Sequence, residues 1–241
     1  MLHSVKELEG FDILAADGAM GKVYEFYFSD SDWFIQYLIA DIGHWLYGKF
    51  VLLEPQDLLQ PDTEKKIFPV ALTKDQVGQS PDISTKKIKI HRNAYLVNEY
   101  GWPNFFETSE GFYSDVISES ELSKDGITRH PREHYDPHLR STWEITGFRL
   151  HASDGEIGHV EDLFFDDSNW RIRYLCVNLR NWLPGGKKVL IPVLLVSRVD
   201  AEGQSIYLDI QREKIKHCPE FHSSSLKDAR FKEDIMKYFA K

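Results

Sequence analysis

Apolar and polar residues alternate with a period of two along two related segments of the chain. Every second residue is apolar in "WFIQYLIAD" and in "WRIRYLCVN": Trp33, Ile35, Tyr37 and Ile39 in the first, and Trp170, Ile172, Tyr174 and Cys176 in the second. This period is typical of a β-strand with one buried face. We therefore predict a strand in each segment, with these residues facing the core.

The opposite face of these two strands differs between the segments. Phe34 and Gln36 stand in the first segment where Arg171 and Arg173 stand in the second. Lys187 and Lys188 follow in the next loop of the second segment, whereas Phe50 lies near that place in the first. We predict a basic contact surface on the second unit and an apolar one on the first.

The two strands belong to a longer internal repeat. When residues 10–53 are aligned with 147–191, about 20 of 44 positions are identical. Both copies contain Asp-Gly between apolar runs, which is a strong hairpin signal because the turn needs positive φ. Gly21 and Gly158 follow each turn, where we expect a bulge or a close backbone approach.

The remaining runs complete the predicted fold. "FVLLEP", "KKIFPVAL" and their second copies read as further strands, and each unit closes with a short polar helical turn such as "TKDQV". We predict a mainly β protein with two small antiparallel β-barrels in tandem, since closure limits exposed strand edges. The expected boundaries are repeat 1 at 1–83, a linker with a short helix at 84–139, repeat 2 at 140–222 and a C-terminal helix at 223–241.

The linker and the tail carry their own apolar groups. The linker contains Trp102, Phe105 and Phe106, and disordered linkers are poor in aromatics, so we expect this part to pack on something. The tail has Ser225 placed as an N-cap and an apolar stripe of Phe231, Ile235 and Phe239 at helical spacing. This helix could cap a barrel within the chain or pack on another subunit.

Charge is distributed unevenly. The net charge is -9, which disfavours binding to nucleic-acid phosphates. Residues 1–83 are strongly acidic, whereas residues 140–241 are nearly balanced. An acidic first unit could therefore contact the basic surface of a neighbouring copy, and we expect a homo-oligomer. The chain shows no leader and no run of about 20 apolar residues, so we expect a cytoplasmic protein without a membrane span.

The candidate chemistry is weak. His130, His134 and His138 stand at four-residue intervals, but Pro131 and Pro137 interrupt a helix there, which favours a solvated linker over a metal site. The acidic turns around Asp30 and Asp166 lack the glycine and distal glutamate of a calcium loop. Neither cysteine lies in a metal or redox motif, and no nucleophile or nucleotide motif is found. We predict no cofactor, no metal and no enzymatic activity.

The repeat resembles the PRC-barrel family in "DGxxGxV", in "W.I.YL" and in the "KKVLIP" run of the second copy. The first copy departs from the pattern at Glu54, where the second has Pro192. This family includes the cytoplasmic domain of the photosynthetic reaction centre H subunit. The resemblance implies small β-barrels and an adaptor or assembly role.

From these features we predict a non-catalytic protein-interaction or assembly module. The alternatives are a small-molecule or metal-binding regulator and an accessory factor in electron or proton transfer similar to the H subunit. The candidate interaction surface comprises Phe34, Gln36, Phe50, Arg171, Arg173, Arg180, Lys187, Lys188, Trp102, Phe105, Phe106, Phe231, Ile235 and Phe239.

Overall fold

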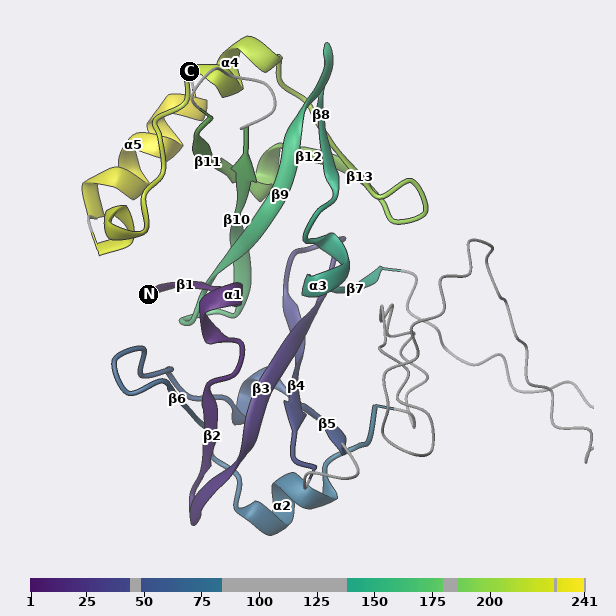
Figure 1. The fold of residues 1–241 in the computed structure, drawn as a ribbon, viewed down its shortest axis with the longest axis vertical. Coiled ribbons are helices and arrows are strands. Elements are labelled where there is room, and N and C mark those ends of the chain that lie inside the picture. Colours follow the sequence, from purple (N-terminus) through teal and green to yellow (C-terminus); the bar gives the residue numbers. More distant parts are fainter. Residues whose placement is uncertain (44–48, 84–137, 180–185, 228, 241) are drawn as a thin grey trace, which may run out of the picture. The chain divides into compact units, whose positions relative to one another are not determined.

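The computed structural model describes residues 1–43, 49–83, 138–179, 186–227 and 229–240. All of them belong to one compact unit, which is mainly β and contains two sheets with short helices around them (Figure 1). The mainly β fold class is therefore confirmed. No helix in these ranges is long and apolar enough to cross a membrane.

The first sheet has six strands in the order β5-β4-β3-β2-β6, with β7 paired to β3. The strands are β2 (Asp12–Ala15), β3 (Gly18–Ser29), β4 (Ile35–Asp41), β5 (Phe50–Leu53), β6 (Ile67–Pro69) and β7 (Leu139–Ser141). The helices of this half of the chain are α1 (Val5–Leu8), η1 (Pro55–Asp57) and α2 (Lys74–Gln79).

The second sheet has seven strands in the order β11-β10-β9-β8-β13-β12, with β1 paired to β9. The strands are β1 (Leu2–Ser4), β8 (Arg149–Ala152), β9 (Gly155–Asp166), β10 (Arg171–Asn178), β11 (Lys188–Pro192), β12 (Val196–Asp200) and β13 (Ser205–Leu208). The helices of this half are α3 (Thr142–Ile145), η3 (Val193–Leu195), α4 (Arg212–Lys216), η4 (Ser223–Lys227) and α5 (Ala229–Phe239).

The glycines after each hairpin turn are required by a close backbone approach, as predicted. Gly21 has φ +82°, and a Cβ there would lie 2.3 Å from the carbonyl oxygen of Asp41. A Cβ at Gly158 would lie 2.5 Å from the carbonyl oxygen of Asn178. The close approach therefore joins equivalent strands in the two sheets, β3 with β4 and β9 with β10.

The Asp-Gly turns also position the closing helices. Asp17 Oδ1 accepts a hydrogen bond from the backbone N–H of Lys74 at 2.7 Å, and Asp154 Oδ1 accepts one from Arg212 at 2.8 Å. A carboxylate at a helix start satisfies a backbone N–H that the helix leaves unpaired. The predicted helical turns are confirmed as α2 and α4.

Two features of the strands differ from the prediction. β2 pairs with β6 and β8 pairs with β13 in parallel, so the expectation of antiparallel strands alone is wrong. β10 is buried on both faces from Tyr174 to Val177, although alternation predicts one core face. Bulges in the β9–β10 pairing after Ile172 and Cys176 break the simple alternation.

Each sheet receives a strand from the other half of the sequence. β1 pairs with β9 of the second sheet, with His3 opposite Phe165. β7 pairs with β3 of the first sheet, with Arg140 opposite Phe28. In Figure 1 these two short strands lie beside β9 and β3 respectively. The predicted sequence boundaries therefore do not separate the two sheets.

Helix α5 packs within the chain. It begins at Ala229 and follows the 3-10 turn η4, so the predicted start at Ser225 is too early. Ile235 and Phe239 are buried in the core, and Phe231 contacts Phe221 with ring centroids 6.1 Å apart. The sequence left open whether this helix packs within the chain or on another subunit, and in the structure its apolar stripe packs within the chain. Ile235 and Phe239 are therefore not a surface for a partner.

Candidate functional site

The two halves of the chain meet in a short seam around two tryptophans. Ile35 N donates to Trp170 O and Ile172 N donates to Trp33 O, each at 2.8 Å. Phe34 and Arg171 lie opposite each other in an antiparallel bridge at the centre of this seam. Phe34 and Arg171, which we predicted on the contact surfaces of two different units, are therefore neighbours at this seam.

Both tryptophans of the seam have positive φ, 61° for Trp33 and 53° for Trp170. Large side chains rarely adopt this conformation. Stacking compensates for it: Trp33 stacks on Phe28 at 5.3 Å and Trp170 on Phe165 at 5.5 Å between ring centroids. The two tight turns are thus fixed by packing, and they determine where the following strands β4 and β10 begin.

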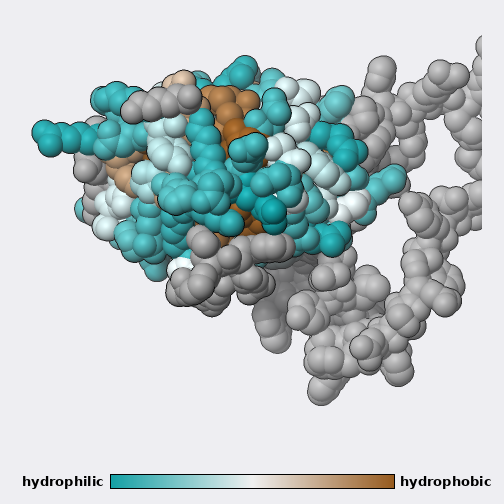
Figure 2. Space-filling model, turned by 90° about the horizontal axis from the view of Figure 1, so that it is seen from above, coloured by the Kyte–Doolittle hydropathy of each residue, from teal (hydrophilic) through white to brown (hydrophobic). Residues whose placement is uncertain are grey.

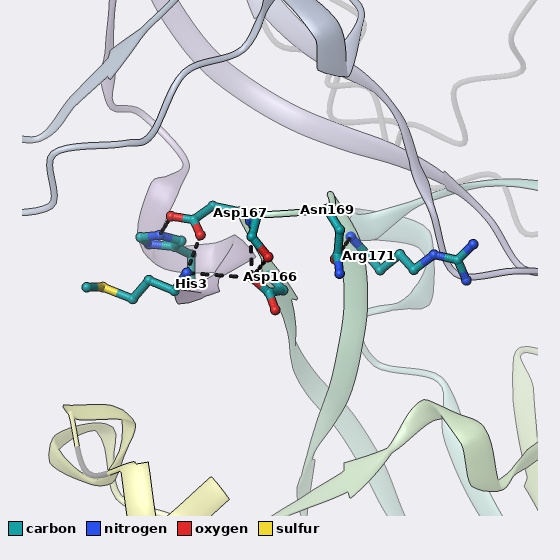
Figure 3. A network of polar contacts seen from close by, with 7 residues as sticks. His3, Asp166, Asp167, Asn169 and Arg171 are labelled. Carbon is teal, nitrogen blue, oxygen red and sulfur yellow. Dashed lines mark hydrogen bonds and ion pairs between the residues drawn. The ribbon is translucent and has the colours of Figure 1, made fainter.

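A buried polar contact lies on each side of the seam. Asp30 forms an ion pair with Arg140 at 2.7 Å and a hydrogen bond with His138 Nδ1 at 2.8 Å. At the equivalent place, His3 Nε2 lies 2.9 Å from Asp167 Oδ2, and the amino group of Met1 also contacts Asp167 (Figure 3). These contacts tie the exchanged strands β7 and β1 to the opposite half of the chain.

The acidic turn before β10 is occupied by its own hydrogen bonds. Asp166 Oδ1 accepts from the backbone N–H of Ser168 at 3.1 Å, and Asn169 Oδ1 accepts from the N–H of Arg171 at 3.2 Å. The Arg171 side chain points away from this cluster (Figure 3) and donates to the carbonyl of Asp32. Within the described ranges, no group of three or more His, Cys, Asp or Glu residues could hold a metal ion.

A pocket of about 570 Å³ lies beyond this turn, and we call it the β10–α5 pocket. Residues from β1, the β9–β10 turn, β10, η3 and α5 line it: Met1, Leu2, Asp166, Ser168, Arg173, Tyr174, Pro192, Val193, Leu194, Lys232 and Met236. Arg173 and Lys232 supply its positive charge. Its volume is within the range of about 300–1,000 Å³ that ligand pockets occupy.

Exposed apolar side chains concentrate at this pocket. Only six large apolar side chains are exposed in the part of the chain that the structure describes, and Met1, Leu194 and Met236 are three of them. Their exposed fractions are 76%, 66% and 41%. On the face shown in Figure 2, a strip of hydrophobic residues runs between hydrophilic ones. Clustered exposed apolar groups mark interaction sites more often than scattered ones do.

The first half of the chain has a smaller and different pocket at the equivalent place. It has a volume of about 300 Å³ and is lined by Phe34, Gln36, Tyr37, Glu54, Pro55 and Gln56. In the aligned repeats Gln36 replaces Arg173, Glu54 replaces Pro192 and Gln56 replaces Leu194. The sequence divergence between the repeats therefore changes an apolar, basic pocket into a polar, acidic one.

Several predicted surface residues are engaged within the chain. Phe50 packs on Tyr24 with ring centroids 4.7 Å apart. Lys187 Nζ donates to the carbonyl of Cys218 at 2.7 Å, and Lys188 pairs with Glu161. These three side chains hold neighbouring elements together, which removes them from a free contact surface.

Other predicted residues lie outside the described ranges: Arg180, Trp102, Phe105 and Phe106. The predicted helix of the linker lies outside them as well, as do His130 and His134.

Sequence reasoning identified Arg173 but missed Leu194, Lys232 and Met236. Leu194 lies in the apolar run "PVLLV", which reads as buried strand, whereas the structure has the 3-10 helix η3 there. Lys232 and Met236 are four residues apart on α5. Each follows directly after a residue of the apolar stripe, Phe231 and Ile235 respectively. Residues at i and i+4 share a helix face, so this spacing was a usable signal.

The two cysteines are unsuited to nucleophilic chemistry. Both are buried, and burial raises the pKa of Cys176 and of Cys218 to about 12. The thiolate is the reactive form of cysteine. Near neutral pH both groups are therefore protonated, unreactive thiols.

Comparison with known proteins gives one family. Residues 146–215 match the model of the PRC-barrel domain. This range runs from the end of α3 to α4 and includes β10, which forms one wall of the β10–α5 pocket. No curated protein matches the chain.

Proposed function

Because residues 146–215 belong to the PRC-barrel family, we propose that the chain is a non-catalytic protein-interaction or assembly module built from two PRC-type units. About 20 of 44 aligned positions are identical between the repeats, and both sheets repeat the same hairpin and the same parallel pair. These likenesses support assigning the family to the first half as well.

The observation that carries the proposal is the exposed apolar cluster of Met1, Leu194 and Met236 beside Arg173 and Lys232. Methionine, arginine and aromatic residues are enriched in protein interfaces. A flexible methionine surface adapts to the shape of a partner side chain. The residues that are identical in both repeats mostly form turns and core. The residues that differ between the repeats are therefore those we expect to contact a partner.

Affinity purification of the tagged chain from its native host, followed by mass spectrometry, tests the proposal. We expect partner proteins to be recovered by the wild type and lost with Leu194→Ser. Leu59→Ser is the matched control, because Leu59 is also an exposed leucine, at 47%, and does not line the pocket. If the wild type retrieves nothing beyond a mock purification, the proposed function is wrong.

A further inference from the structure

The β10–α5 pocket combines an apolar floor with positive charge. Tyr174 and Leu2 are nearly buried at its base, at 7% and 9% exposure. Met1, Leu194 and Met236 form exposed apolar walls. A ligand that fills it must therefore bring at least one large apolar group, since water alone leaves this surface unfavourably hydrated.

Two cations line the pocket, and neither is held in a direct contact. Among the described residues, Arg173 and Lys232 make no direct hydrogen bond or ion pair, although the charge of Arg173 helps to lower the pKa of Asp166. Asp166 is the one acidic residue of the lining, and its carboxylate already accepts from Ser168 and lies 3.5 Å from the amino group of Met1. A negative group on the ligand would therefore find two cations available.

We infer that the β10–α5 pocket binds an acidic peptide segment of a partner protein, in which a leucine-like side chain is flanked by carboxylates. This inference rests on the proposed function and names the chemistry of its partner. The apolar side chain fills the space between Leu194 and Met236, and the flanking carboxylates pair with Arg173 and Lys232. Helix α5 provides one wall of this pocket through Lys232 and Met236.

The equivalent pocket of the first half does not fit this ligand. Gln36 and Glu54 stand at the places of Arg173 and Pro192, so a carboxylate would meet a neutral amide and another carboxylate. Like charges in contact are unfavourable. The acidic peptide is therefore expected at one site per chain, in the second half.

The three methionines of the chain allow this site to be observed directly. Met1 and Met236 line the pocket, whereas Met20 packs on the core near Gly78 in the first half. NMR of the full chain labelled with ¹³C at the methionine methyls gives two reporters and one internal control. Single Met→Leu variants assign the signals.

The probes are a short acetylated peptide with a leucine pair flanked by glutamates, its analogue with lysines for glutamates, and its analogue with serines for leucines. We expect the glutamate–leucine peptide alone to shift the Met1 and Met236 signals to saturation, with Met20 unchanged. Arg173→Gln and Lys232→Gln, two independent exposed or half-exposed changes, should each weaken binding about tenfold. Added salt should weaken it as well.

Three outcomes of the probe experiments overturn the inference. The lysine analogue can bind as tightly as the glutamate peptide, the peptide can shift Met20 instead, or decanoate can shift Met1 and Met236 where the peptide does not. The last result makes the pocket a site for small amphiphiles. If native partners are still retrieved by Leu194→Ser, the peptide site is wrong while the proposed interaction function stands.

Discussion

Arg140 and Asp30 form a buried ion pair that joins the two halves of the chain. The guanidinium Nε lies 2.7 Å from the Asp30 carboxylate, and the two side chains are 13% and 7% exposed. Loss of Arg140 leaves the buried Asp30 carboxylate with only the exposed His138 ring beside it, so we expect Arg140→Met to lower the free energy of unfolding by about 3 kcal/mol. Urea denaturation measures this. The double variant Asp30→Asn/Arg140→Met should lose less than Arg140→Met, and an equal or greater loss contradicts the role of the pair.

The exchanged strands predict that the two halves of the chain associate when separated. β1 completes the second sheet and β7 completes the first, so fragments 1–88 and 137–241 should form a one-to-one complex on co-expression. Native mass spectrometry measures the stoichiometry. A first fragment that lacks residues 1–4 should associate more weakly, since it has lost β1 and the Ser4–Asp162 hydrogen bond. Equal association of the two fragments would show that strand exchange is dispensable.

A single methyl group added at Gly21 should strongly lower the stability of the fold. Gly21→Ala should destabilise the fold by about 2 kcal/mol or more, because its φ is +82° and the new Cβ would lie 2.3 Å from a backbone oxygen. Gly78→Ala is the control. It lies in α2, where the new Cβ would meet only the Met20 methyl at 3.7 Å, and should be neutral or stabilising. Thermal unfolding compares the two, and similar midpoints would refute the close approach.

Asp162 predicts a pH dependence of stability. Burial raises the pKa of Asp162 above the ordinary 3.8. The hydrogen bond that Ser4 Oγ donates to the carboxylate at 2.5 Å acts in the opposite direction but is the smaller effect. The folded state therefore holds this proton more tightly than the unfolded chain does. Its contribution to stability is full below pH 3.8 and is lost as the pH rises through the raised pKa.

Asp162→Asn removes this contribution. Urea denaturation across the acidic range should show that the stability difference between wild type and variant shrinks or reverses in favour of the variant as pH rises. The exposed Glu202→Gln serves as the control. A difference that grows with pH would mean that the carboxylate, and not the carboxylic acid, is the stabilising form.

The two cysteines should react slowly with thiol reagents in the folded chain. With both pKa values at about 12, neither Cys176 nor Cys218 should react appreciably with Ellman's reagent at pH 8 in the folded chain. In urea both thiols of the sequence should react promptly. Rapid reaction of either thiol without denaturant would show that the site opens to solvent.

Turns and glycines could be predicted from the sequence because their causes are local. Asp17-Gly18 and Gly21 act within a few residues, through positive φ and a close approach that no other residue tolerates. Thr73 and Gln76 form a capping box at the start of α2, which is likewise a local cause. The two resulting hairpin units followed directly from the repeat.

Strand exchange could not be predicted, because three-residue strands leave no periodicity. His3 and Arg140 are polar residues that become buried only through Asp167 and Asp30 of the other half. The β10–α5 pocket escaped prediction for a related reason. Its walls come from β1, η3 and α5, and only the folded chain brings Leu194 and Met236 near Arg173.

The pairing of β7 with β3 also affects synthesis of the chain on the ribosome. When β9 is synthesised, its partner β1 has already left the ribosome. The edge of β3, in contrast, has no partner until β7 is synthesised, more than one hundred residues later in the sequence. At about 5–20 residues per second, this edge stays unpaired for several seconds. An open strand edge is a template for pairing with other chains. On the nascent first half, the backbone groups of Tyr27, Phe28 and Ser29 are therefore the edge at which we expect pairing with other chains.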